Sequence, residues 1–247
     1  EFMSKGIIAI DAALATPATT PNNNQEAIDN IPMFSAAAGT IVAPTSPATT
    51  YTTASNIALQ HQLAKITVGK IKVDFPQSGP YKSATFQPTS FFLINVPNDL
   101  IFNKDAWTTA ATSYWQGCSK DPSAADYKKY LGTDIFTTPY SALKYSTNDA
   151  ENSITPNSVF YTIPNYSDAN NTKLVIGGEF NPDPSNASNH ATTVYYPVNI
   201  NWVYTAATKS SAPAQSGTVA KKVYPNRNYT CNIFIQLQKR LVLDIKL

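Results

Sequence analysis

Alternation of apolar and polar residues recurs along the chain and predicts β-strands. The most regular run covers residues 194–204, where one phase holds Val194, Tyr196, Val198, Ile200, Trp202 and Tyr204. The opposite phase includes Tyr195, Asn199 and Asn201. A strand with one face buried in a sandwich produces this pattern. Pro197, inside the run, predicts an edge strand or a bulge, because proline cannot donate to a β-ladder.

Two further segments predict strands with special features. In residues 63–75 the apolar phase changes at Gly69: it holds Ala64, Ile66 and Val68 before the glycine, then Ile71, Val73 and Phe75. A phase change at a glycine indicates a β-bulge. Residues 91–96 are almost continuously apolar and end at Pro97, which is typical of a central strand buried on both faces.

Other segments complete the predicted architecture. Residues 159–163, 173–180 and 229–237 are β-patterned, and short helices are expected at 6–15 and 121–132. The latter has Asp121 as N-cap, Pro122 at the first position and Gly132 at the end. Because residues 133–156 are polar and lack a sustained period, we place a domain boundary near Asn148. The prediction is an all-β protein with domains at 1–148 and 149–247.

The last residues form a separate alternating segment. Val242, Asp244 and Lys246 occupy one phase, and the opposite phase is entirely apolar, with Leu241, Leu243, Ile245 and Leu247. This pattern predicts a strand with one hydrophobic face. It either closes its own domain, as terminal strands usually do, or pairs with another copy of the protein.

Composition excludes several classes of protein. Apolar residues make up 43% and charged residues 14% of the chain, which is too apolar for a disordered segment. No run approaches the roughly 18 apolar residues of a membrane helix. The net charge is +2 and the basic residues are scattered, so the dense basic face expected for nucleic-acid binding is missing.

Candidate chemistry is sparse, and we expect neither an enzyme nor a bound cofactor or metal. His61 and His190 have no second ligand cluster nearby in the sequence, and no nucleophile has a base at a recognisable spacing. The Asx-rich run 181–189 offers oxygen ligands, but it lacks the turn glycine and closing Glu of a calcium loop, which favours a turn. A hydrolase is therefore the weakest candidate.

The cysteines and the aromatic residues each allow two interpretations. Cys118 and Cys231 could pair in an oxidising compartment, but Cys231 is in phase with apolar neighbours, which favours a buried free thiol. The 14 tyrosines could line a sugar-binding groove. Their positions on alternating segments favour packing on sheet faces.

Several segments together resemble the fimbrillin family of Bacteroidales, the type V pilins. The similar segments, in order, are Ile31-Pro-Met-Phe-Ser, Leu63-Ala-Lys-Ile-Thr-Val, Phe86 to Pro97, Phe160-Tyr-Thr-Ile-Pro-Asn, Thr172 to Phe180, Tyr195 to Asn201 and Asn226-Arg-Asn-Tyr. The order and spacing of these segments over most of the chain carry the resemblance. The first strands of the family and its long C-terminal extension have no counterpart in this sequence.

The resemblance implies a fold and a function. The fold is two transthyretin-like β-sandwich domains with Greek-key type connections and a few short helices, the N-terminal one lacking its first strands. The function is a structural subunit of a surface fimbrium that assembles by β-strand exchange and contributes to adhesion. Expected partners are other fimbrial subunits and host proteins or glycans, with a lipid anchor in the outer membrane before maturation. The strand that fills a neighbour's groove would use Leu241, Leu243, Ile245 and Leu247.

A different class of protein is the alternative. A cell-surface carbohydrate-binding or adhesin module that does not polymerise would use exposed Tyr and Trp and Asx-rich loops. Trp107 and Trp115 are the residues whose substitution would separate this alternative from the pilin on a glycan array.

Overall fold

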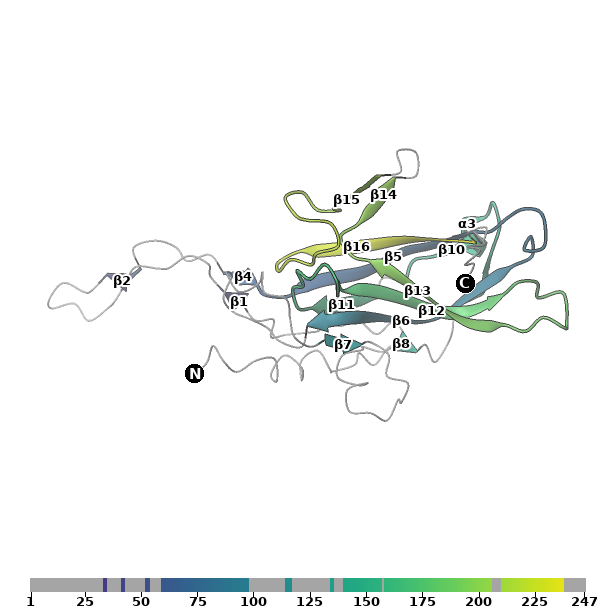
Figure 1. Ribbon diagram of the computed structural model, residues 1–247, viewed down its shortest axis with the longest axis horizontal. Coiled ribbons are helices and arrows are strands. Elements are labelled where there is room, and N and C mark those ends of the chain that lie inside the picture. Colours follow the sequence, from purple (N-terminus) through teal and green to yellow (C-terminus); the bar gives the residue numbers. More distant parts are fainter. Residues whose placement is uncertain are drawn as a thin grey trace, which may run out of the picture.

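The computed structural model describes residues 33–34, 41–42, 52–53, 59–97, 114–116, 134–135, 140–156, 158–205 and 210–237. These residues form β-strands and one short helix, so the all-β prediction is confirmed (Figure 1). Both predicted helices, at 6–15 and 121–132, lie outside the described residues, as do Cys118 and Trp107. Among the described residues, no helix is long and apolar enough to cross a membrane.

One sheet is built around β5 (Ala64–Asp74), and we call it the β5 sheet. The short strands β10 (Ser153–Ile154) and β11 (Val159–Thr162) pair antiparallel with β5, and β16 (Asn228–Gln236) pairs with it in parallel. The helix α3 (Asp149–Asn152) precedes β10 and is capped by the side chain of Asn148.

The second sheet is built around β6 (Thr85–Pro97), and we call it the β6 sheet. One edge of β6 pairs with β12 (Lys173–Asn181), which in turn pairs with β13 (Thr192–Asn199). The other edge pairs with three short strands, β7 (Tyr114–Gln116), β8 (Asp134–Ile135) and β9 (Leu143–Lys144). The remaining described strands form two-residue or three-residue pairs: β1 (Met33–Phe34) with β4 (Gln60–His61), β2 (Ile41–Val42) with β3 (Thr52–Thr53), and β14 (Val203–Thr205) with β15 (Ser210–Ala212).

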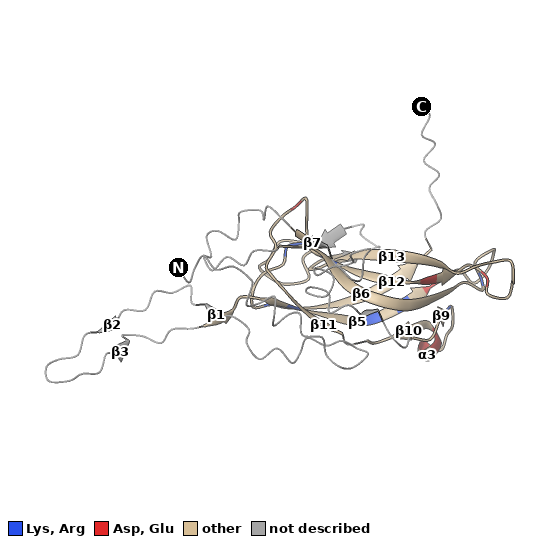
Figure 2. Ribbon diagram, turned by 90° about the horizontal axis from the view of Figure 1, so that it is seen from below, with Lys and Arg blue, Asp and Glu red and all other residues tan. Residues whose placement is uncertain are grey.

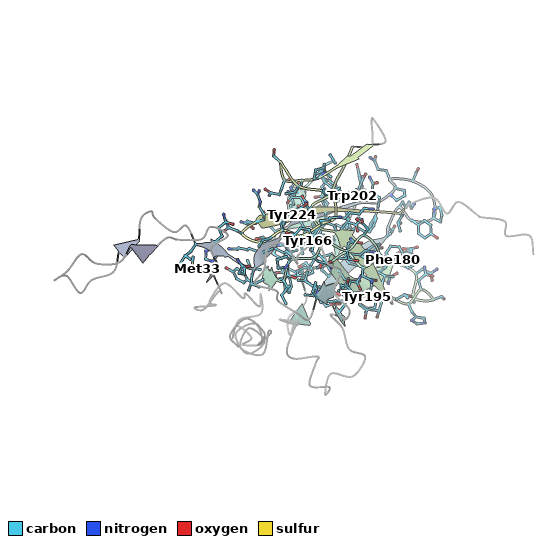
Figure 3. All side chains as sticks on the ribbon, turned by 60° about the vertical axis from the view of Figure 1, so that its left-hand side comes forward. Met33, Tyr166, Phe180, Tyr195, Trp202 and Tyr224 are labelled. Carbon is cyan, nitrogen blue, oxygen red and sulfur yellow. The ribbon has the colours of Figure 1, made fainter. Side chains whose placement is uncertain are left out.

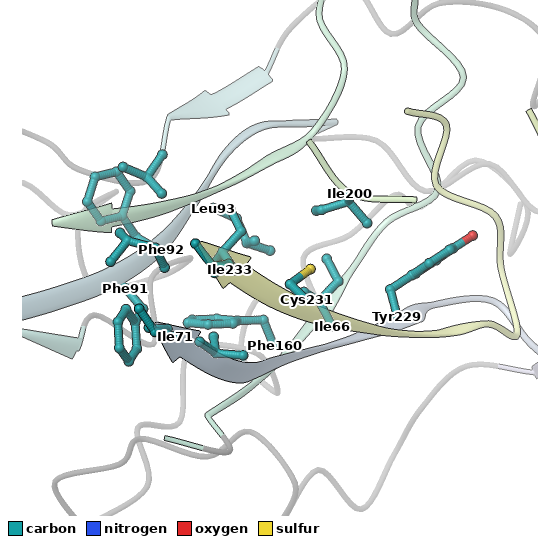
Figure 4. Packing of buried hydrophobic residues seen from close by; sticks show 14 of the residues in the cluster. Ile66, Ile71, Phe91, Phe92, Leu93, Phe160, Ile200, Tyr229, Cys231 and Ile233 are labelled. Carbon is teal, nitrogen blue, oxygen red and sulfur yellow. The ribbon is translucent and has the colours of Figure 1, made fainter. Parts of the chain in front are cut away.

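Side chains from both sheets meet in one hydrophobic cluster (Figure 4). The β5 sheet contributes Ile66, Ile71 and Ile233, and the β6 sheet contributes Phe91 and Leu93. All five are at most 5% exposed. At one end of the cluster Phe75 packs edge-on against Phe180, with ring centroids 6.0 Å apart. The β5 sheet and the β6 sheet therefore form a sandwich with a shared core.

The predicted boundary near Asn148 does not divide this sandwich and is corrected by the strand pairing. β5 precedes the boundary and pairs with β11 and β16, which follow it, and β6 pairs with β12 in the same way. The polar segment 133–156 suggested a linker because it lacks a long period. Its described part instead contributes β8, β9, α3 and β10, elements too short to show one.

Two local predictions are confirmed, and a pair of glycines allows close packing in the β6 sheet. β6 is central in its sheet, and Phe91, Phe92, Leu93 and Val96 are all buried. β13 is an edge strand among the described residues, with the phase of Val194, Tyr196 and Val198 packed against the core. The predicted single strand over 194–204 is wrong in its length, because β13 ends at Asn199 and β14 begins only at Val203. Gly177 and Gly178 mark close packing, because an added Cβ would meet Tyr195 or Phe86 side-chain atoms.

Candidate functional site

The strand β16 is the best candidate for an interaction site because it lies at the edge of the β5 sheet. Its inward residues, Tyr229, Cys231, Ile233 and Ile235, are all at most 9% exposed, and they alternate with exposed residues. Among the described strands, only β5 pairs with β16. The other edge of β16 therefore offers backbone N–H and C=O groups that no described strand uses.

A β-bulge fixes the register of β16. Cys231 pairs with Val68 and Ile233 pairs with Ile71, so Gly69 and Lys70 together oppose the single residue Asn232. The backbone N–H of Lys70 donates to Oδ1 of Asn232 at 2.9 Å. An added Cβ on Gly69 would collide with that side chain. The phase change at Gly69 is thus a bulge, as predicted, and Asn232 completes its hydrogen bonding.

The two sides of β5 are held by charged and polar contacts. At the end of β16, Nε2 of Gln236 donates to Oδ2 of Asp74 at 2.7 Å. On the α3 side, Nζ of Lys70 lies 2.8 Å from Oδ2 of Asp149 and that of Lys72 lies 3.6 Å from Oδ1. Figure 2 shows a basic stretch of β5 and acidic positions in α3. The Lys70 hydrogen bond and charge, with the charge of Lys72, lower the pKa of Asp149 below its ordinary value of 3.8.

The outward face of β16 carries one large apolar side chain. Phe234 is 67% exposed, whereas its outward neighbours along the strand are polar: Asn228, Thr230, Asn232 and Gln236. It pairs in register with Lys72 of β5. The sequence analysis did not single out Phe234. Its position in the otherwise polar phase of residues 228–236 could have predicted an exposed aromatic side chain.

The edge strand of the β6 sheet, β13, differs from β16 in its exposed aromatic residue. Tyr195 is labelled in Figure 3. It is 55% exposed, but its ring packs edge-on against Phe92 at a centroid distance of 6.0 Å. It also covers Gly177, since a Cβ built there would lie 3.0 Å from the ring. Tyr195 is therefore a packing residue of the outer face of the β6 sheet.

The thiol of Cys231 is buried inside the β5 sheet. It is a free cysteine, and burial raises its pKa to about 12. A thiol with this pKa is protonated at neutral pH and is a poor nucleophile or metal ligand. Cys231 thus acts as a small core residue, as its phase predicted.

The Asx-rich run after β12 forms turns. Oδ1 of Asn181 accepts from the backbone of Asp183, Oδ1 of Asp183 accepts from Ser185, and Oδ1 of Asn186 accepts from Ser188. Within the described residues, no group of three or more His, Cys, Asp or Glu side chains could hold a metal ion. The run is accordingly an Asx-turn loop, the alternative that the sequence favoured.

The predicted polymerisation residues, Leu241, Leu243, Ile245 and Leu247, lie outside the described residues, so their role stays a prediction. His61 and His190 are both described and exposed, and they lie on separate elements, β4 and the loop before β13.

Comparison with known proteins gives only distant similarities. No family model matches the chain, and no curated protein matches it. Among solved structures, a proposed cell adhesion protein from Parabacteroides distasonis is 14% identical with a TM-score of 0.42, over 73% of this chain and 45% of that one. A fimbrilin from Porphyromonas gingivalis is 16% identical with a TM-score of 0.39, over 73% and 52%.

A further similar structure is a proposed cell adhesion protein from Bacteroides eggerthii, 16% identical with a TM-score of 0.41, over 74% of this chain and 48% of that one. The chain thus spans about half the length of these structures. Identities and TM-scores of this size show a general likeness and do not establish membership in a family.

Proposed function

We propose that this chain is a structural subunit of a bacterial surface fibre, assembling by β-strand exchange and contributing to adhesion. Its partners are further copies or sister subunits, together with host proteins or glycans. The subunit acts at the cell surface as part of a fimbrium. Before that, a lipid anchors it in the outer membrane. It has no catalytic role in this proposal. The resemblance of the ordered segments from Ile31 to Tyr229 to fimbrillins supports this proposal.

One observation carries the proposal: β16 has an edge that no described strand occupies. A strand of another molecule can add to such an edge through main-chain hydrogen bonds, and alternate side chains then supply specificity. Phe234 on the same strand adds an exposed aromatic surface of the kind enriched at protein interfaces.

The residues that follow β16 supply a matching donor. Residues 241–247 alternate between an apolar phase and a phase with Val242, Asp244 and Lys246. A strand of this kind pairs by its backbone and buries one face, which is what an edge of a sandwich accepts. In the proposed fibre, the apolar phase of one subunit packs against the next subunit.

The test compares two changes in that segment. The double variant Leu243→Asp/Ile245→Asp places charges on the apolar phase, and Val242→Asp places one on the opposite phase as a matched control. Light scattering after size exclusion, with negative-stain microscopy, should show rods for the wild type and Val242→Asp and monomers for the double variant. Circular dichroism checks that all three are folded. Folded proteins with identical size distributions would refute the proposed role of this phase.

A further inference from the structure

A cleft of about 260 Å³ lies at the start of the β5 sheet, where β16 begins. We call it the Arg227 cleft; it is lined by His61, Leu63, Lys65, Tyr161, Asn226, Arg227 and Asn228. Sites for drug-sized ligands usually measure roughly 300–1,000 Å³, so this cleft has room for one ring-sized group.

Strand register explains why these residues meet. Lys65 pairs with Tyr161 of β11 on one side and with Asn228 of β16 on the other, so the three form a row across the sheet. Lys65 and Asn228 belong to the phase opposite the core, since their neighbours Ala64 and Tyr229 are buried, whereas Tyr161 is partly buried and packs against the core cluster. The buried side chain of Leu63 supplies an apolar part of the lining.

The turn that carries Arg227 is held in place by several contacts. The backbone N–H of Asn226 donates to the carbonyl of Leu63 at 3.0 Å, and that of Lys65 donates to the carbonyl of Arg227 at 2.8 Å. Just before them, the N–H of Tyr224 donates to Oη of Tyr229, and the Tyr224 ring packs edge-on against Tyr166 at 4.8 Å (Figure 3). The cleft is therefore preformed by backbone contacts, which lowers the entropic cost of binding a ligand.

The charge of the lining is one-sided. His61, Lys65 and Arg227 contribute basic groups, and none of the described residues that line the cleft is Asp or Glu. Arg227 is also one of only two arginines in the sequence, the other being Arg240.

We propose that the Arg227 cleft binds a carboxylate-bearing monosaccharide unit, such as a uronic acid residue of a glycan. A guanidinium group forms paired, charge-assisted hydrogen bonds with a carboxylate, which favours Arg227 as the principal contact. The ring of Tyr161 and the apolar side chain of Leu63 suit the C–H face of a sugar ring. The amides of Asn226 and Asn228 can donate to and accept from its hydroxyl groups. This mixed lining favours a sugar acid over an inorganic anion, which would need only the cations.

The experiment is a titration of the isotope-labelled full chain with sodium glucuronate, followed by amide chemical shifts. Glucose tests whether the carboxylate is needed, and an acetyl-capped Asp-Glu dipeptide tests whether the sugar is. The expected result is saturable shifts at residues 63–65, 161 and 226–228 with glucuronate only. Affinity should fall with added salt, because the exposed charges are screened.

Two variants complete the test. Arg227→Gln should weaken glucuronate binding at least about tenfold, since a charge-assisted contact is lost. Lys82→Gln removes an exposed cation from the turn beyond the far end of β5 and should leave the affinity unchanged. The spectra themselves show whether each variant is folded. The proposal would be overturned if glucose or the dipeptide bound as tightly as glucuronate. It would also be overturned if Arg227→Gln bound glucuronate like the wild type, or if no saturable shifts were seen.

Discussion

The two long edge strands of the sandwich, β13 and β16, differ in how they meet solvent. β13 contains Pro197, which removes one backbone donor, and its exposed aromatic residue Tyr195 packs back onto Phe92. β16 has no proline, and its exposed aromatic residue, Phe234, is 67% exposed. Proline is one of the features by which natural sheets block pairing at an edge. The comparison therefore supports the proposal that β16, and not β13, accepts a partner strand.

The two strands also differ in how firmly they are anchored. The inward residues of β16 are nearly completely buried, whereas those of β13, Val194, Tyr196 and Val198, are only partly buried. A strand that accepts a partner must keep its own position while the new strand is added. The buried face of β16, together with the bulge at Gly69, meets this requirement.

The largest predicted effect tests this anchoring. Ile233→Ala removes a buried side chain of β16 and should lower the free energy of unfolding by about 2–5 kcal/mol, because the core cannot fully close the cavity. Val198→Ala on β13 should cost less, since its side chain is only half-buried. Urea unfolding of both variants provides the measurement. Equal losses would show that the two edges are anchored alike.

A second prediction concerns the bulge that sets the register of β16. Gly69→Ala should cost about 1–3 kcal/mol, because the new Cβ collides with Asn232 and disturbs its hydrogen bond to Lys70. Asn232→Ala alone should cost about 1 kcal/mol for the lost hydrogen bond. The double variant should be more stable than the sum of the single losses predicts, because the collision is relieved. Strict additivity in a double-mutant cycle would argue against this packing.

A third prediction separates the two exposed aromatic residues. Phe234→Ser should change the free energy of unfolding by no more than about 0.5 kcal/mol, because the side chain is exposed, but it should weaken assembly. Tyr195→Ser should cost about 1 kcal/mol, since it uncovers Phe92, and should leave assembly unchanged. Thermal unfolding and light scattering on the same samples measure both properties. The reverse pattern would identify β13 as the assembly edge.

The smallest predicted effect is a pH dependence on the α3 side of β5. The pKa of Asp149 is lowered by the hydrogen bond and charge of Lys70 and by the charge of Lys72. Its contribution to stability is thus fully present above the ordinary pKa of 3.8 and is lost as the pH falls through the lowered value. Asp149→Asn should be slightly less stable than the wild type near neutral pH.

The check is urea unfolding of the wild type and Asp149→Asn at pH of about 6 and about 2. The difference in stability between the two proteins should shrink at the lower pH, because the wild-type carboxylate is then largely protonated. A difference that stays constant would show that Lys70 and Lys72 do not stabilise the charged form.

Local features of the fold were readable from the sequence. The change of phase at Gly69 predicted the bulge, the apolar run from Phe91 predicted the central strand β6, and Pro197 predicted an edge. Each follows from side-chain alternation or from the missing donor of proline, which are properties of a few adjacent residues.

The pairing between distant strands was not readable in the same way. The parallel pairing of β16 with β5 joins residues about 160 positions apart, such as Asn228 and Lys65, and no local period specifies it. The predicted boundary near Asn148 was wrong for the same reason. The Arg227 cleft likewise depends on four strands and a turn meeting in space, so its basic residues look scattered in the sequence.

The central claim is that β16 is the edge used for assembly. Hydrogen exchange on assembled and monomeric protein tests this claim most directly. Along β16, alternate backbone N–H groups point away from β5, and these should exchange quickly in the monomer and become protected in the fibre. The amides of β13 should exchange alike in both states. Protection that appears on β13 and leaves residues 228–236 unchanged would contradict the claim.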